Sequence, residues 1–309
     1  MPVNPQFSMI LPRLHEAVAM SRAIAEGKAP PIDMPPGAMG PVTPVAYVED
    51  RTLSTPEGLV PIRIYAPRQG VALPLVLFFH GGGFVSGDVN THDEITRQLA
   101  IAADCVVVSV SYSLAPAHPF PAALHDCLAA IDWAVSHAAE IGADATRLAV
   151  AGDSAGGNLA SVTALYLRDN NGAKLSAQLL IYPGTDPAGR REGPPQGSMA
   201  ETGEGFYISQ EMMDFYHASY IAGADASSPY ISPLRAQSLA NLPPALVLTA
   251  EYDPLRDQGQ AYARRLAEDG VLVELVNYEG AIHGFLSFPV PMGKEAIEYC
   301  GAWLGQQLS

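Results

Sequence analysis

From about residue 43 onward, short apolar runs alternate with segments in which apolar residues recur at helical spacing. Most of these runs are continuously apolar, as expected for parallel strands that are covered on both faces. The predicted strands are 42–53 and 59–65, which are close enough to form a hairpin, followed by 73–79, 105–110, 147–151, 177–182, 245–250 and 271–278. The clearest helical patterns are 91–102, 122–138, 157–166, 258–268 and 294–304. The pattern predicts an α/β fold with a mostly parallel, eight-stranded sheet and helices on both faces.

Two segments interrupt this alternation. Residues 1–42 are helix-like at 12–26 and then rich in Pro, Gly and Met, and residues 186–229 pass from a Gly/Pro-rich loop into a helix-like stretch at 209–221. Insertions of this length in a compact domain usually serve as lids or binding elements. We expect the two segments to form a helical cap over the edge of the sheet. The core would then comprise residues 43–185 and 230–309.

Composition and charge narrow the range of partners. With 309 residues, 48% hydrophobic and 16% charged, the chain can bury a large core. Its net charge of −15 disfavours nucleic acid and anionic membranes as partners. Residues 1–20 show no signal-peptide pattern and no apolar run reaches membrane-spanning length, so we expect a cytoplasmic protein. The cysteines, Cys105, Cys127 and Cys300, have neither disulfide nor metal-ligand spacing, and no metal is predicted.

The stretch Gly152-Asp153-Ser154-Ala155-Gly156 carries the most specific chemical signal. It lies between a predicted strand and a predicted helix, which is the context of a nucleophile elbow. Glycines on both sides of the serine let strand and helix approach closely. The N-terminus of the following helix favours developing negative charge. We therefore predict that Ser154 is a nucleophile.

A serine nucleophile needs a base and an acid that orients the base. In folds with this elbow the chain order is serine, acid, histidine. Two histidines follow Ser154: His217 lies in the expected cap, and His283 lies in a loop after the last predicted strand. The acid should follow the seventh strand, and we choose Asp253 just past its end. The competitors are Glu251, at the strand edge, and Asp257, which is expected to start or cap the next helix.

The oxyanion produced by nucleophilic attack needs backbone N–H donors. Ala155 follows the nucleophile and can supply one. The loop His80-Gly81-Gly82-Gly83-Phe84, directly after a predicted strand, can supply others. No Gly-Lys-Ser/Thr follows the glycines, so a phosphate-binding loop is not supported. We expect His80 to anchor this loop rather than to act as the base.

These motifs together resemble the hormone-sensitive-lipase-like family of α/β-hydrolases. The residues that carry the resemblance are His80–Phe84, Gly152–Gly157, Asp253–Asp257 and His283–Phe285, and it extends over most of residues 43–309. The family includes bacterial carboxylesterases and arylacetamide deacetylase. The resemblance implies an α/β-hydrolase fold with a cap, no metal or organic cofactor, a triad of Ser154, Asp253 and His283, and an oxyanion hole formed by the N–H groups of Gly82, Gly83 and Ala155.

The resemblance is incomplete at residues 112–121. The family pattern usually has arginine where this chain has Ser113, and often glutamate where it has Ala117. An ion pair that would anchor this loop is therefore missing. Asp153 marks the Gly-Asp-Ser-Ala-Gly subgroup, and we interpret it as loop support rather than as a catalytic group.

The resemblance implies hydrolysis of short- to medium-chain carboxylic esters through an acyl-enzyme, with a small-molecule ester as the binding partner. Amide hydrolysis by the same triad is the first alternative. A non-catalytic small-molecule receptor is the second, and it is disfavoured because such receptors typically lack the histidine that this chain retains as His283. The family also suggests a homodimer through residues 271–278. Side chains expected to line the substrate pocket are Phe84, Asp153, Phe206, Tyr207 and Phe215.

Overall fold

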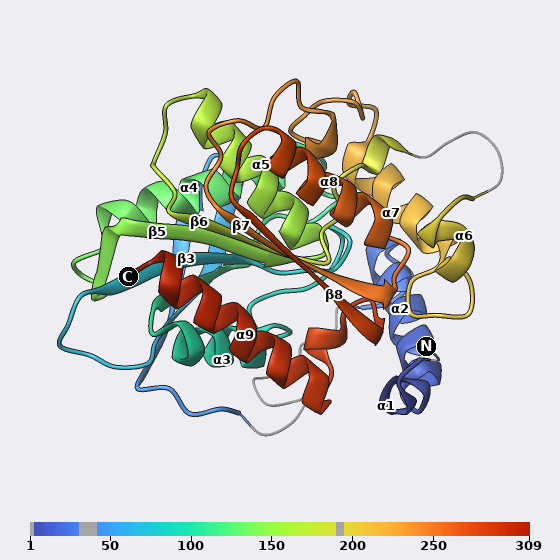
Figure 1. Ribbon diagram of the computed structural model, residues 1–309, viewed down its shortest axis with the longest axis horizontal. Coiled ribbons are helices and arrows are strands. Elements are labelled where there is room, and N and C mark those ends of the chain that lie inside the picture. The colour runs from blue at the N-terminus through green and yellow to red at the C-terminus, as the bar shows by residue number, and fades with distance from the viewer. Residues whose placement is uncertain (1–2, 31–41, 190–194) are drawn as a thin grey trace.

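Eight strands form one sheet in the order β1-β2-β4-β3-β5-β6-β7-β8 in the computed structural model, which describes residues 3–30, 42–189 and 195–309 (Figure 1). β2 is antiparallel to its neighbours β1 and β4, and all the other neighbouring strands are parallel. The strands are β1 (Tyr47–Thr55), β2 (Gly58–Ala66), β3 (Leu73–Phe79), β4 (Val106–Val110), β5 (Ala143–Asp153), β6 (Ala177–Ile181), β7 (Ala245–Tyr252) and β8 (Val273–Ile282). The predicted fold class is confirmed.

Helices cover both faces of the sheet (Figure 1). One face carries α3 (Asp93–Ala103) and α9 (Pro291–Gln307), and the other carries α4 (Ala122–Ser136), α5 (Ala155–Asp169) and α8 (Arg256–Glu268). The fully buried strand β3 shows why both layers are needed. Its side chains alternate between two hydrophobic clusters, one on each face of the sheet. Each such side chain contributes about 1.5–3 kcal/mol on burial, so neither face of the strand tolerates exposure to water.

All eight predicted strands exist, but some of their bounds differ. The first begins at Tyr47 rather than at residue 42, because Tyr47 pairs with Ala66, the last residue of its partner strand β2. β5 begins at Ala143, four residues early, because a register shift lets its first residues pair with the start of β3. β8 continues to Ile282, four residues beyond the prediction, and so delivers the chain directly to His283.

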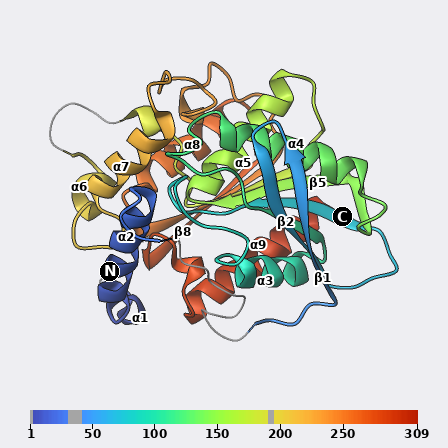
Figure 2. The ribbon, with the colours of Figure 1, turned by 180° about the vertical axis from the view of Figure 1, so that it is seen from behind.

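The two predicted cap segments lie side by side at one end of the molecule (Figures 1 and 2). The first contains α1 (Pro5–Ser8) and α2 (Leu11–Ala25), and the second contains the 3₁₀ turn η1 (Pro187–Gly189), α6 (Ser198–Thr202) and α7 (Gln210–Ile221). Arg22 Nη1 lies 2.5 Å from Glu211 Oε1, and His15 Nε2 lies 2.6 Å from the carbonyl oxygen of Phe206. Residues 1–2, 31–41 and 190–194 of the predicted cap lie outside the described residues, and the domain bounds stay a prediction.

Within the described ranges, no helix combines the length and the apolar character needed to cross a bilayer.

Candidate active site

Ser154 occupies a sharp turn between the end of β5 and the start of α5. Its backbone has φ 55° and ψ −115°, a combination that costs a non-glycine residue about 1–3 kcal/mol and that must be held by its surroundings. Glycine is required on both sides of this turn. A Cβ at Gly152 would lie 2.2 Å from the carbonyl oxygen of Gly156, and one at Gly156 would lie 1.9 Å from that of Phe79. The strained turn therefore depends on the glycines that the motif provides.

The structure brings the three predicted side chains into one hydrogen-bonded chain. His283 Nε2 lies 2.8 Å from Ser154 Oγ, and His283 Nδ1 lies 2.7 Å from Asp253 Oδ2. All three are at least nine-tenths buried. Because a carboxylate only accepts, Nδ1 must carry the proton in this contact, which leaves Nε2 free to accept from the serine hydroxyl. This arrangement allows a histidine to act as a general base toward serine.

The competing residues lie in different surroundings. Glu251 Oε2 accepts a hydrogen bond from the N–H of Gly280 at 2.6 Å, and this contact holds the pKa of Glu251 below its ordinary value. Asp257 lies in the first turn of α8 and accepts from the N–H of Ser198. His217 lines a cavity of about 580 Å³ whose lining includes none of the three predicted triad residues. The geometry therefore favours Asp253 and His283.

The predicted oxyanion loop has an unusual backbone. Gly82, Gly83 and Phe84 all have positive φ angles, of 123°, 63° and 65°. Within the described chain, the N–H groups of Gly82, Gly83 and Ala155 donate no hydrogen bond, whereas the neighbouring N–H of Gly81 does. Ala155 is also the first residue of α5, where helix N–H groups have no intrahelical partner. These three N–H groups are thus available to a negatively charged oxygen.

The carboxylate of Asp153 is hydrogen-bonded to the backbone of this loop. Its Oδ1 accepts a hydrogen bond from the N–H of Gly81 at 2.8 Å, and His92 Nε2 lies 3.2 Å from the same oxygen. Burial raises the pKa of the Asp153 carboxyl, but His92, the Gly81 N–H and His80 together outweigh burial and leave this pKa below its ordinary value. A charged carboxylate therefore ties the residue before the predicted nucleophile to the start of the predicted oxyanion loop.

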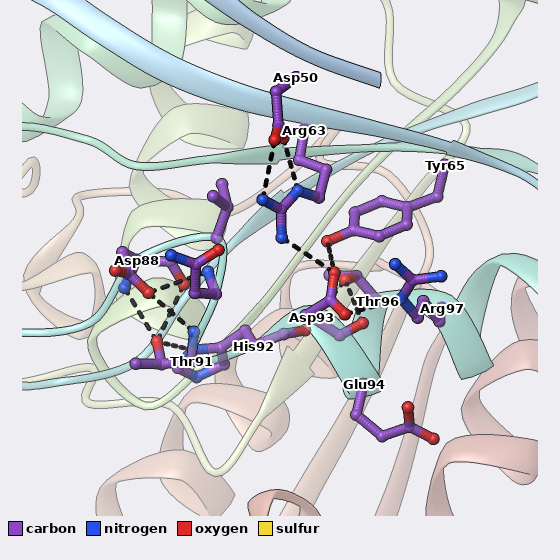
Figure 3. Close-up of polar contacts among 12 residues, drawn as sticks. Asp50, Arg63, Tyr65, Asp88, Thr91, His92, Asp93, Glu94, Thr96 and Arg97 are labelled. Carbon is purple, nitrogen blue, oxygen red and sulfur yellow. Dashed lines mark hydrogen bonds and ion pairs between the residues drawn. The ribbon is translucent and has the colours of Figure 1, made fainter. Parts of the chain in front are cut away.

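His92 Nδ1 lies 2.9 Å from Thr91 Oγ1, and His92 adjoins a charged network that sequence reasoning missed (Figure 3). It precedes Asp93, the first residue of α3. The buried Asp93 carboxylate accepts from Arg63 Nη1 at 3.1 Å, from the Tyr65 hydroxyl at 2.7 Å and from Arg97 Nε at 2.7 Å. The network joins β2 to α3. The signal in the sequence was Arg63, a lone cation in an otherwise apolar strand, which must find a partner when it is buried.

The loop at residues 112–121 is anchored without the family's ion pair. The buried carboxylate of Asp126 accepts from the N–H of Ser113 at 2.8 Å and from Thr55 Oγ1 at 2.6 Å. The N–H of Ala115 donates to the carbonyl of Phe84 at 2.9 Å. The carboxylate of Asp126 and a backbone hydrogen bond therefore anchor this loop in place of the ion pair.

His80 is the first residue of the predicted oxyanion loop, and its ring stacks on that of Tyr112 with centroids 4.2 Å apart. Its Nδ1 donates to the carbonyl of Gly81 at 2.7 Å. Burial, reinforced by His92, lowers the pKa of His80 to about 4. A neutral histidine whose Nδ1 is bonded to the loop backbone fits the predicted anchoring role.

This burial predicts a pH dependence of stability. His80 is neutral in the folded protein down to about pH 4, whereas in the unfolded chain it binds a proton below about pH 6.5. Between these values the unfolded state binds more protons, so the free energy of unfolding should fall as the pH is lowered, by roughly 3 kcal/mol in total. Urea unfolding across this range should give a shallower pH dependence for His80→Asn than for the unchanged protein. Equal slopes would contradict a buried neutral His80.

The aromatic residues predicted to contact substrate occupy different places. The Tyr207 ring centroid lies 6.4 Å from that of His283. Phe84 stacks on Tyr220. The ring of Phe206 stacks on that of Tyr252. The ring of Phe215 lies under the guanidinium of Arg22. Substrate contact stays a prediction for each of them.

The three cysteines are free and buried. In the part of the chain that the structure describes, no cluster of three His, Cys, Asp or Glu side chains could hold a metal ion.

Comparisons with known proteins agree with this fold. The family described as the alpha/beta hydrolase fold matches residues 76–287. Esterase LipI of Mycobacterium tuberculosis is 43% identical over 83% of this chain and 81% of that protein. An arylesterase of Saccharolobus solfataricus is 42% identical over 81% of this chain and 80% of that protein. The solved hyperthermophilic esterase of the archaeon Pyrobaculum calidifontis superposes with a TM-score of 0.84 at 38% identity and covers 99% of both chains. The chain therefore belongs to the hormone-sensitive-lipase-like family of α/β-hydrolases.

Proposed function

We propose that this protein is a serine carboxylesterase that hydrolyses short- to medium-chain carboxylic esters through an acyl-enzyme. The observation that carries the proposal is the buried hydrogen-bonded chain from Ser154 through His283 to Asp253. The available N–H groups of the oxyanion loop beside it, and the esterase names of the relatives, support the same reaction.

In the proposed mechanism Ser154 Oγ attacks the ester carbonyl while its proton moves to His283 Nε2. The charge that develops on the carbonyl oxygen is stabilised by the N–H groups of Gly82, Gly83 and Ala155. His283 then gives its proton to the leaving alcohol, and an acyl-enzyme remains. Water, activated by the same histidine, releases the acid. Asp253 holds the imidazole in the required tautomer and stabilises its protonated form.

Amide hydrolysis remains the first alternative, because the same groups can attack an acetamide. A comparison of an aryl acetate with the matching acetanilide separates the two activities. Binding without turnover is the second alternative. A fluorophosphonate probe distinguishes it, because the probe labels a serine only when that serine is activated. Labelling of Ser154 together with rapid turnover of the acetate is expected.

The second cap segment should limit the length of the acyl chain. Its α7 contributes the apolar side chains of Met212, Met213 and Phe215, which suit an enclosed apolar pocket. Each added methylene contributes about 0.8 kcal/mol while the pocket has room, so kcat/KM should rise roughly fourfold per carbon and then fall. Initial rates on p-nitrophenyl esters from acetate to palmitate measure this profile. A rate that keeps rising to palmitate would contradict a closed pocket.

The association state is a separate proposal. β8 lies at one edge of the sheet, where Leu272 and Leu275 are exposed, and an unpaired edge strand can pair with that of a second copy. Sedimentation velocity at micromolar concentration tests for the expected homodimer, and a monomer would contradict it. The cytoplasmic location expected from the sequence stays a prediction.

A further inference from the structure

We propose that helix α7 holds the oxyanion loop in its working conformation, with Tyr216 and Tyr220 as positioning residues. This inference rests on the ester hydrolysis proposed above. It gives α7 a role in transition-state stabilisation in addition to the shaping of a substrate pocket.

The oxyanion loop needs external support because its backbone is strained. Gly82 and Gly83 adopt positive φ angles at little cost, but Phe84 has a side chain and a φ of 65°. Non-glycine residues keep such a conformation only where the surrounding structure enforces it. The loop closes on itself through the N–H groups of Val85 and Ser86, which both donate to the carbonyl of Gly82. These two hydrogen bonds do not involve the side chain of Phe84, so its orientation depends on the residues packed around it.

Two rings of α7 provide this support. The ring of Tyr220 lies parallel to that of Phe84, with centroids 3.7 Å apart and an interplanar angle of 5°, and Tyr220 is fully buried. One turn earlier, the ring of Tyr216 covers Gly83. A Cβ at Gly83 would lie 2.4 Å from Tyr216 Cγ. α7 therefore contacts both the residue that carries a proposed oxyanion donor and the strained residue after it.

A backbone bridge fixes the spacing between α7 and the loop. The segment at residues 112–121 runs between them: the N–H of Ala115 donates to the carbonyl of Phe84, and the N–H of Phe120 donates to the carbonyl of Tyr220 at 2.8 Å. The ring of Phe120 also meets that of Tyr220 edge to face. Displacement of α7 would consequently pull on the loop through side chains and backbone together.

A small displacement is enough to affect catalysis. Oxyanion donors act only at hydrogen-bond distance from the developing charge, and an error of about 1 Å in positioning costs about 100-fold in rate. A ring that lines the acyl pocket would behave differently, since its removal changes long and short substrates unequally. Acyl-length dependence therefore separates a positioning role from a pocket role.

The test compares Tyr220→Leu with Tyr220→Phe. Within the described chain the Tyr220 hydroxyl has no hydrogen-bond partner, so phenylalanine preserves the stack and leucine removes it. We expect Tyr220→Leu to lower kcat about 10- to 100-fold, by the same factor on acetate, butyrate and octanoate esters, with KM changed less than threefold. Affinity for a trifluoromethyl ketone, which forms a tetrahedral adduct on serine, should fall in parallel. Tyr220→Phe should restore turnover.

Tyr230→Leu is the matched control. It removes a ring that packs against Tyr166 of α5, with centroids 5.4 Å apart, and it should leave kcat unchanged. If Tyr220→Leu does not fold, as judged by thermal melting, Tyr216→Leu decides the question by the same measurements. Unchanged kcat, or a loss that depends on acyl length, would overturn the inference. Failure of the proposed function would instead leave the unchanged protein without esterase activity or Ser154 labelling.

Discussion

Ser154→Ala should abolish ester hydrolysis while leaving the fold intact. The alanine lacks the oxygen that would attack the substrate, and it removes only one buried atom next to His283. Loss of the nucleophile in serine hydrolases lowers kcat on the order of 10⁴- to 10⁶-fold. The residual catalysis of such variants comes from the oxyanion donors and from substrate binding. Steady-state rates on p-nitrophenyl butyrate, with active-site titration to exclude residual unchanged enzyme, measure the loss.

Ser161→Ala is the control for this experiment. Ser161 is also buried on α5, and its Oγ donates to the carbonyl of Asn158 at 2.8 Å, away from the histidine. The Ser161→Ala variant should retain the turnover of the unchanged protein, and fluorophosphonate should still label it. Melting temperatures of both variants should stay near that of the unchanged protein. Activity of Ser154→Ala within tenfold of the unchanged enzyme would refute the proposed nucleophile.

The parts of the site that could be predicted from the sequence are those that depend on local chain geometry. Ser154 lies in a strand–turn–helix motif whose glycines have a steric function that can be read from five residues. Asp253 and His283 follow the ends of parallel strands, and such ends meet at one edge of a sheet. Chain order then selected among a few candidates.

Contacts between distant segments could not be predicted in this way. The tyrosines of α7 were recognisable as aromatic residues of a helix, but periodicity does not say which loop a helix face will cover. The stack of Tyr220 on Phe84 joins residues separated by more than a hundred positions. The contact of His92 with Asp153 likewise depends on where α3 packs. In both cases a side chain far along the chain supports a backbone conformation that its own sequence does not secure.

The bounds of strands show the same limit on a smaller scale. β5 starts four residues before its apolar run, at Ala143, because pairing with β3 across a register shift stabilises a segment whose own sequence is half polar. β8 has alternating burial at the sheet edge, and its length is set by pairing with β7 up to Tyr252 and Ile282. The hydrophobic pattern therefore predicts that a strand exists, whereas pairing with the neighbouring strand determines where the strand begins and ends.

Asp253→Asn should lower kcat by about 10⁴-fold, far more than Glu251→Gln or Asp257→Asn. The reason lies in the second oxygen of Asp253, which accepts the N–H of Leu255 at 2.7 Å. In the variant, the amide oxygen is the group that can satisfy this N–H, so the amide NH₂ turns toward His283 Nδ1. A donor facing Nδ1 forces the ring proton onto Nε2, and Nε2 can then no longer accept the proton of Ser154.

The two control variants keep the contacts that their parent side chains make. A glutamine at 251 can still accept from Gly280, and an asparagine at 257 can still accept from Ser198, so each should stay within about tenfold of the unchanged enzyme. Rates on p-nitrophenyl butyrate at one pH, with thermal melting as the check on folding, compare all three. A larger loss for Glu251→Gln than for Asp253→Asn would show that the acid was wrongly assigned. Because Asp253 is fully buried between His283 and the start of α8, its replacement tests orientation of the imidazole rather than surface charge.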